Sequence, residues 1–146
     1  MLYFDTSFLV PLILPEATSD KIAAFIRTLT AEAFSVSHWT LVEFSSLIAR
    51  AVRMGGLDSG AAMRADARFG EMVEASFTVL LPTANDFALA RQYLRKPETG
   101  LRAGDALHLA VATNHHAVAI YSLDKIFLRA GTILQLPVSM GIRARP

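Results

Sequence analysis

Four acidic residues stand where hydrophobic runs and helix starts would bring distant parts of the chain together: Asp5, Glu43, Asp105 and Asp124. Grouped carboxylates raise one another's pKa, and a hard divalent cation offsets that repulsion. Mg²⁺ and Mn²⁺ prefer oxygen ligands and keep several waters, which leaves positions open for phosphate oxygens. One or two such ions can ionise an attacking water and stabilise the leaving oxygen of a phosphodiester. The four acids therefore indicate metal-dependent hydrolysis of a phosphodiester.

The elements that must position these acids follow from hydrophobic runs and from Gly, Pro and capping residues. Short apolar runs predict strands at residues 2–4, 33–36, 77–81, 118–122 and 136–139. A short helix follows the first strand, and helical patterns predict further helices at residues 18–29, 40–54, 58 or 59 to about 74, 83–94, 102–115 and 124–129. Alternating strands and helices, with strands apolar on both faces, predict a three-layer α/β/α sandwich with a central, mainly parallel sheet. Residues 1–146 are expected to form one domain, because no repeat or linker interrupts them.

This arrangement predicts that the four acids share one edge of the sheet. Asp5 follows the first strand and Asp124 follows the fourth, and ligands of parallel sheets bind beyond the carboxyl ends of the strands. Glu43 and Asp105 are expected in the first turns of the helices at 40–54 and 102–115. Their joint placement favours one site over four separate structural roles.

Each acid also has a purely structural interpretation. Asp5 and Asp124 can cap the helices that follow them. Glu43 can complete a capping box that begins at Thr40, and the helix dipole favours Asp105 in a first turn. The alternative is therefore a non-catalytic α/β domain that binds RNA or a protein and uses its acids as helix caps.

Composition narrows the class of protein. Hydrophobic residues make up 53% of the chain and charged residues 18%, which excludes disorder and favours cover of some apolar surface by a partner or a second copy. No apolar run is long enough for a membrane span, and the N-terminus lacks the features of a signal peptide. The absence of cysteine excludes disulfides and thiolate metal sites, and a cytoplasmic location is expected by default.

The charge balance is basic once the four acids are set aside. Fourteen Lys and Arg residues then face nine acids, and eleven of the fourteen are arginines. Arginine binds phosphates in a bidentate manner, which fits a polyanionic substrate, although genome composition also produces such a bias. Two consecutive predicted helices carry four arginines, which either contact RNA or an acidic partner or simply face solvent: Arg50, Arg53, Arg64 and Arg68.

Four segments resemble the four motifs of PIN-domain ribonucleases, especially the VapC-like toxins of type II toxin–antitoxin pairs. They are LYFDTSFLV at 2–10, SHWTLVEF at 37–44, LRAGDALHLA at 101–110 and IYSLDKIF at 120–127. Their order and spacing match the family over residues 1 to about 130. The resemblance implies a PIN-like fold and a metal-dependent endoribonuclease that hydrolyses RNA. It also implies that Asp5, Glu43, Asp105 and Asp124 hold Mg²⁺ or Mn²⁺.

The same resemblance assigns further roles. Ser7 and Ser122 would orient carboxylates or a bound water. A homodimer is implied, together with a small antitoxin that blocks the site. Many family members carry Thr at the position of Ser122 and a further acid at the position of Lys125 or Ile126. Asp124 is therefore expected either to bind the metal directly or to hold one of its waters.

Two other enzyme and signalling classes begin with an acid after the first strand. Phosphatases of the haloacid-dehalogenase type need a second Asp two residues later, where this chain has Ser7. Response-regulator receivers need a phosphorylatable Asp after the third strand, where this chain has Leu81 and Pro82. Both classes are excluded.

Two aromatic side chains near the acids have alternative roles. His108 shares a helical face with Asp105, so it either binds a transition metal or is buried and hydrogen-bonded, and the second role is favoured. Trp39 either stacks on an RNA base or belongs to the core or a dimer interface, and again the second role is favoured.

Overall fold

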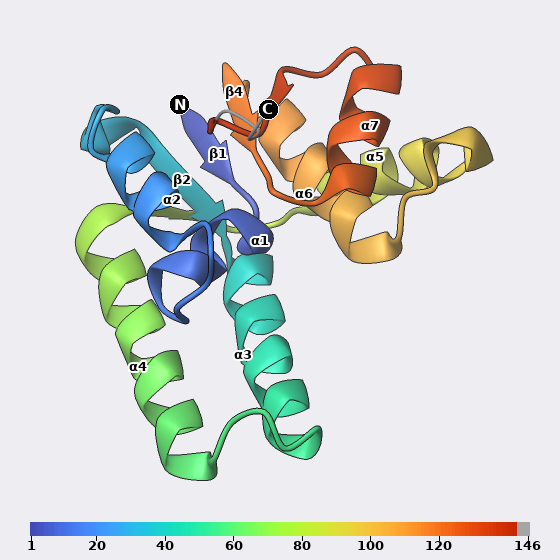
Figure 1. Cartoon of the computed structure of the whole chain (residues 1–146). Helices are drawn as coiled ribbons and strands as arrows, with labels where there is room; N and C mark the ends of the chain where they lie inside the picture. Colours follow the sequence, from blue (N-terminus) through green and yellow to red (C-terminus); the bar gives the residue numbers. More distant parts are fainter. Residues whose placement is uncertain (143–146) are drawn as a thin grey trace.

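The computed structural model describes residues 1–142, and a five-stranded sheet lies at its centre (Figure 1). Every pair of neighbouring strands runs parallel, in the order β3-β2-β1-β4-β5. The strands are β1 (Leu2–Phe4), β2 (Phe34–Ser37), β3 (Thr78–Leu80), β4 (Ala119–Tyr121) and β5 (Val138–Ser139). The predicted α/β fold with a parallel central sheet is confirmed.

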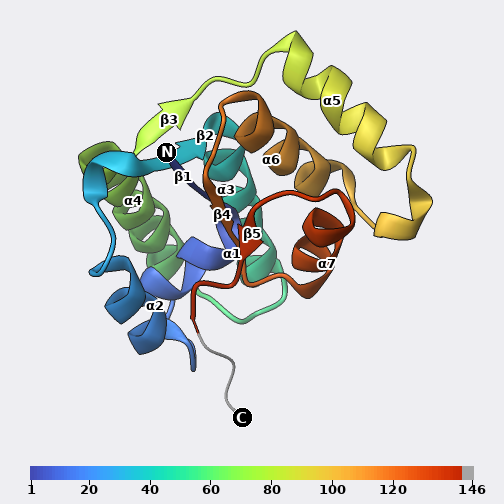
Figure 2. The same cartoon turned by 90° about the horizontal axis from the view of Figure 1, so that it is seen from above.

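Helices cover both faces of this sheet (Figure 2). They are α1 (Thr6–Leu9), α2 (Ser19–Ile26), α3 (His38–Arg53), α4 (Ser59–Ser76), α5 (Ala84–Leu94), α6 (Ala103–Asn114) and α7 (Lys125–Ile133). Short 3₁₀ turns complete the chain at η1 (Val10–Leu12), η2 (Ala31–Ala33) and η3 (Pro97–Thr99).

Successive side chains of each strand point to opposite faces of the sheet, so each face has its own hydrophobic core. Phe4 and Val36 pack with the apolar sides of α1, α2, α3 and α4. Tyr3 and Ile120 point to the opposite face, where they pack with α5, α6 and α7. Burial on both faces explains why these strands are almost continuously apolar.

Helices α3 and α4 form a hairpin that extends away from the sheet (Figure 1). Gly55 ends the first helix with a positive φ of 75°, a conformation that favours glycine. Phe44 and Phe69 stack between the two helices, with ring centroids 3.9 Å apart. The hairpin therefore holds α3 firmly, and α3 carries one of the predicted site residues.

One expected helix start was wrong, and this moves Glu43. Helix α3 begins at His38, because Ser37 and Thr40 form the capping box and the Ser37 N–H donates to Thr40 Oγ1 at 3.2 Å. Glu43 consequently lies in the second turn of α3 and caps no helix. The other boundaries differ from expectation by a few residues, the largest extension being that of α7 to Ile133. Within residues 1–142, no helix has the length and apolar character needed to cross a membrane.

Candidate active site

The order of the strands reverses at β1, and this places a crevice at the carboxyl edge of the sheet. From β1 the chain builds β2 and β3 on one side and later adds β4 and β5 on the other. Asp5 comes directly after β1, and Asp124 lies shortly after β4. Ligands of open parallel sheets bind at such a switch point.

All four acids predicted from the sequence line one cleft of about 530 Å³ at this edge. Asp5 comes from the end of β1, Glu43 from α3, Asp105 from the first turn of α6 and Asp124 from the start of α7. The cleft is completed by Thr6, Ser7, Trp39, Val42, Ser46, Leu47, Arg50 and Arg102. The structure therefore brings together all four acids from four distant segments.

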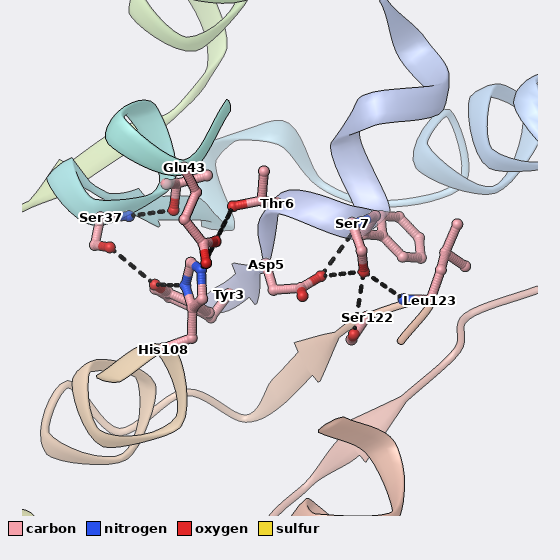
Figure 3. Close-up of polar contacts among 11 residues, drawn as sticks. Tyr3, Asp5, Thr6, Ser7, Ser37, Glu43, His108, Ser122 and Leu123 are labelled. Carbon is pink, nitrogen blue, oxygen red and sulfur yellow. Dashed lines mark hydrogen bonds and ion pairs between the residues drawn. The ribbon is translucent and has the colours of Figure 1, made fainter. Parts of the chain in front are cut away.

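Asp5 is buried at the base of the cleft, and its carboxylate points towards Ser7 (Figure 3). Its Oδ1 accepts hydrogen bonds from Ser7 Oγ at 2.8 Å and from the Phe8 N–H at 3.2 Å, so it also caps α1. Burial raises the pKa of Asp5 to about 6, against the lowering effects of His108 and of these hydrogen bonds. In the absence of a cation, the ionised form of this carboxyl is disfavoured.

Asp105 and Asp124 face the same cleft from the two neighbouring helix starts. Burial, followed by the negative charges of Asp124 and Glu43, raises the pKa of Asp105. Asp124 caps α7, because its Oδ1 accepts from the N–H groups of Ile126 at 2.7 Å and Phe127 at 2.9 Å. The capping roles expected for Asp5 and Asp124 are therefore confirmed, and both residues still line the cleft.

The hydroxyls of Ser7 and Ser122 connect Asp5 to the loop that carries Asp124 (Figure 3). Ser7 Oγ lies 3.2 Å from Ser122 Oγ and accepts from the Leu123 N–H at 2.9 Å. Ser122 Oγ in turn accepts from the Asp124 N–H at 3.0 Å. The two serines thus fix the relative positions of the acids at the ends of β1 and β4.

Glu43 is held by a second group of buried polar side chains. Its Oε2 accepts from Thr6 Oγ1 at 2.6 Å and lies 2.6 Å from His108 Nε2. Burial alone would raise the pKa of Glu43, but the hydrogen bond and the attraction to His108, together with Thr6, hold it below its usual range. His108 is fully buried, as expected, and its Nδ1 lies 2.8 Å from the Tyr3 hydroxyl.

No pattern in the sequence indicates that Tyr3, Thr6 or Gly104 belongs to the site. Tyr3 and Thr6 are separated from His108 by 105 and 102 residues. A Cβ on Gly104 would stand 2.7 Å from Glu43 Oε1 and 3.2 Å from the Trp39 indole, so any other residue there would displace the Glu43 carboxylate. The motif around Asp105 contains this glycine, but its spacing alone does not indicate what it contacts.

Trp39 separates the acidic cleft from an apolar cavity on α5 and α6. The side chain borders both spaces and is partly buried, in agreement with a packing role. Its indole N–H is buried and close enough to Glu43 to lower that pKa, yet within residues 1–142 it has no hydrogen-bond partner of acceptable geometry.

The donor set of the cleft fits a hard divalent cation. Four carboxylates supply only oxygen ligands, and burial raises the pKa of both Asp5 and Asp105, so their ionised forms are disfavoured until a cation is bound. In the described part of the chain, however, no three acidic or histidine side chains are spaced closely enough to hold an ion as they stand. The ligand types therefore suit a divalent cation, but the carboxylates must move closer together to bind it.

Solved structures with the same fold cover nearly the whole chain. FitAcB from Neisseria gonorrhoeae is 20% identical with a TM-score of 0.70, covering 97% of this chain and 98% of its own. VapC20 from Mycobacterium tuberculosis, a sarcin–ricin-loop-cleaving toxin, is 24% identical with a TM-score of 0.70, covering 90% and 95%. VapBC-1 from nontypeable Haemophilus influenzae is 18% identical with a TM-score of 0.67, covering 97% and 98%.

Sequence comparison identifies the family. No curated protein matches the chain. The family model described as PIN domain matches residues 2–133, which include all four acids and the four motifs on which the resemblance rests. That resemblance is confirmed: the chain belongs to the PIN-domain family.

Proposed function

We propose that this chain is a metal-dependent endoribonuclease that hydrolyses RNA phosphodiester bonds, and that it is the toxin of a toxin–antitoxin pair acting in the cytoplasm. The observation that carries the proposal is the convergence of Asp5, Glu43, Asp105 and Asp124 on one cleft at the switch point of the sheet. The similarity in fold to VapC20, a toxin that cleaves the sarcin–ricin loop, supports RNA as the substrate.

Asp5, Glu43 and Asp105 would hold Mg²⁺ or Mn²⁺ through their carboxylate oxygens, and Asp124 would bind the ion directly or through one of its waters. When bound, the ion would supply a water of lowered pKa and a counter-charge for the scissile phosphate. Ser7 holds the Asp5 carboxylate by its Oδ1, and Ser122 holds the backbone of Asp124. These contacts restrict the two carboxylates before substrate arrives, as outer hydrogen bonds do at metal sites.

The alternative is a binding domain without catalytic activity, and the capping roles of Asp5 and Asp124 favour it. Capping does not explain Glu43, which caps no helix and is half-buried beside the other acids. The direct test is cleavage of RNA by the wild-type chain and by the Asp5→Asn variant. A binding domain would retain RNA in both forms and cut it in neither.

Two arginines on the rim of the cleft are suited to bind the RNA backbone. Arg50 and Arg102 are exposed and line the cleft, and neither forms an ion pair within residues 1–142. In an Asp5→Asn background, we expect Arg50→Ala or Arg102→Ala to weaken binding of single-stranded RNA and to reduce the salt slope of log K by about 0.7 each. Fluorescence anisotropy across a salt series measures both quantities.

The matched control is Arg27→Ala, an exposed arginine at the end of α2 that does not line the cleft. It should leave both affinity and salt slope unchanged. An unchanged salt slope for both rim variants would show that the RNA backbone does not follow this cleft.

An antitoxin is the second proposed partner. The structural neighbours include VapBC2 from Rickettsia felis bound to a promoter DNA fragment, as well as VapBC-1. Beside the acids, α3 exposes Val42 and Leu47, which are 57% and 37% accessible. An antitoxin segment packed on these side chains would cover the cleft and exclude RNA.

A homodimer is proposed through the apolar cavity of about 400 Å³ on α5 and α6. Phe87, 53% exposed, and Leu94 stand on its rim, and Trp39 and Leu107 line it. Phe87 and the cavity lie on the same face of the molecule. Around a two-fold axis through that face, the Phe87 side chain of each copy can enter the cavity of the other copy. We expect Phe87→Arg to convert a dimer of twice 15.9 kDa into a 15.9 kDa monomer in light scattering.

Met63→Arg serves as the control, because Met63 is 74% exposed on α4 and lies outside this cavity. That variant should remain dimeric. A Phe87→Arg protein that keeps the dimeric mass would place the interface elsewhere.

A further inference from the structure

Glu43 enters the cleft with its two carboxylate oxygens in different states. Oε2 is engaged twice, by Thr6 Oγ1 at 2.6 Å and by His108 Nε2 at 2.6 Å. Oε1 has no hydrogen bond of acceptable geometry from residues 1–142. A carboxylate can accept at both oxygens, so this asymmetry is imposed by the surrounding residues.

His108 is held in turn by Tyr3, on the side of its ring away from Glu43 (Figure 3). Its ring is fully buried, its Nδ1 lies 2.8 Å from the Tyr3 hydroxyl, and that hydroxyl lies 3.0 Å from Ser37 Oγ. An ionised carboxylate only accepts hydrogen bonds, so His108 Nε2 is protonated and donates its N–H to Glu43 Oε2. Rotation of the ring would break the contacts at both nitrogens, and the donor therefore stays in place.

Oε1 lies beside the turn that carries Asp105. A Cβ on Gly104 would stand only 2.7 Å from Oε1, and Asp105 is the next residue of α6. Thr6, the other donor to Oε2, directly follows Asp5. The contacts at Oε2 thus turn Oε1 towards the segment of α6 that supplies another acid of the cleft.

We propose that His108 is a positioning residue: with Thr6 it holds Glu43 by Oε2, so that Glu43 offers only Oε1 to a divalent cation. This inference rests on the proposed metal-dependent function. Without the two donors, only the nearby Trp39 indole would restrain the Glu43 carboxylate, and its orientation would have to be fixed when the ion binds. Hydrogen bonds that orient metal ligands in this way contribute about 10–100-fold in metal affinity.

Two amide substitutions separate the hydrogen bond to Glu43 from the packing of a buried ring. In His108→Gln, the amide nitrogen can reach the position of Nε2 and still donate to Glu43. In His108→Asn, the shorter amide can reach only the position of Nδ1, next to Tyr3. Both variants replace the ring by an amide in the same buried place. The full chain would be titrated with Mn²⁺ alone in a calorimeter, and unfolding would be measured without metal.

We expect the Gln variant to bind Mn²⁺ within about threefold of wild type and the Asn variant to bind about tenfold more weakly or worse. The unfolding temperatures of the two metal-free variants should be similar. Thr6→Val provides a second reading, because valine keeps the volume and removes the other donor to Oε2, and it should also weaken Mn²⁺ binding.

Equal Mn²⁺ affinity in the Gln and Asn variants, whether unchanged or reduced, would overturn the positioning role. If the Asn variant does not fold, an unchanged affinity in Thr6→Val overturns it and a weakened affinity supports it. A wild-type chain that does not bind Mn²⁺ at all would instead contradict the proposed function. The two failures are therefore distinguishable.

Discussion

Asp5→Asn should abolish RNA cleavage while the protein stays folded. The amide cannot carry the negative charge that Asp5 contributes to the cleft, and we expect a loss of at least about 100-fold, or roughly 3 kcal/mol of transition-state stabilisation. The fold should persist, because the Asn Oδ1 can still accept from Ser7 Oγ and from the Phe8 N–H. Cleavage of a labelled RNA, with circular dichroism of both proteins, measures activity and fold together.

The same variant should be more stable than wild type when no metal is present. Burial raises the pKa of Asp5 to about 6, so the folded state favours the protonated acid. The free energy of unfolding of the wild-type chain is therefore highest at low pH and falls as the pH rises from about 4 to about 6. Above that range, the buried ionised carboxylate destabilises the folded state. Asparagine has no charge to bury, and we expect it to be more stable by roughly 2–3 kcal/mol at about pH 8 and by little at about pH 4.

Urea unfolding in chelator across this pH range gives the comparison. Asp66→Asn is the control, because Asp66 is an exposed acid on α4 that bonds Ser45 and lies outside the cleft. It should cleave RNA normally and leave the pH dependence of stability unchanged. If the Asp5→Asn protein still cleaves RNA, Asp5 is not a catalytic residue. If it is less stable than wild type at high pH, burial of the Asp5 charge does not destabilise the fold.

The placement of the acids was predictable because each depends on a local pattern. A short apolar run followed by Asp5 predicts a strand end, and the Ala- and Leu-rich stretch after Asp105 predicts a helix start. The parallel sheet then brings the carboxyl ends of β1 and β4 to one edge without any knowledge of side-chain contacts. Local patterns and one topological rule were sufficient for this part.

The start of α3 shows where a local pattern was ambiguous. Ser37 and Thr40 are both good N-cap residues, and the sequence favoured a box from Thr40 to Glu43. In the structure, Ser37 is the cap and Thr40 completes the box. Glu43 is thereby released from capping, and its carboxylate turns to Thr6 and His108 instead.

The orientation of Glu43 could not be read from the sequence, because its partners lie far away along the chain. His108 is separated from Glu43 by 65 residues and from Tyr3 by 105. Helical spacing placed His108 on the face of Asp105, but a period of 3.6 residues does not specify which residue of another element it meets. Only the packing of α6 against β1 and α3 determines that contact.

Removal of divalent metal should abolish RNA cleavage, and Mn²⁺ or Mg²⁺ should restore it. Mn²⁺ should also raise the free energy of unfolding, by about 2.7 kcal/mol when its concentration is 100 times the dissociation constant. The physical reason is that the ion offsets the burial cost that raises the pKa of Asp5 and of Asp105, and also the repulsion from Asp124 and Glu43 that raises the pKa of Asp105 further. Thermal unfolding with and without Mn²⁺ is a readout that does not depend on the choice of RNA.

The response of single-acid variants to Mn²⁺ distinguishes a metal site from a set of helix caps. Asp5→Asn and Asp105→Asn should lose most of the Mn²⁺ stabilisation, because each removes a charged oxygen ligand. Asp124→Asn should lose less if Asp124 holds only a water, since its Oδ1 is already occupied by the Ile126 and Phe127 N–H groups. A loss equal to that of Asp5→Asn would make Asp124 a direct ligand through its other oxygen. A wild-type chain that Mn²⁺ does not stabilise, and that cuts RNA in the presence of chelator, would require a mechanism without metal.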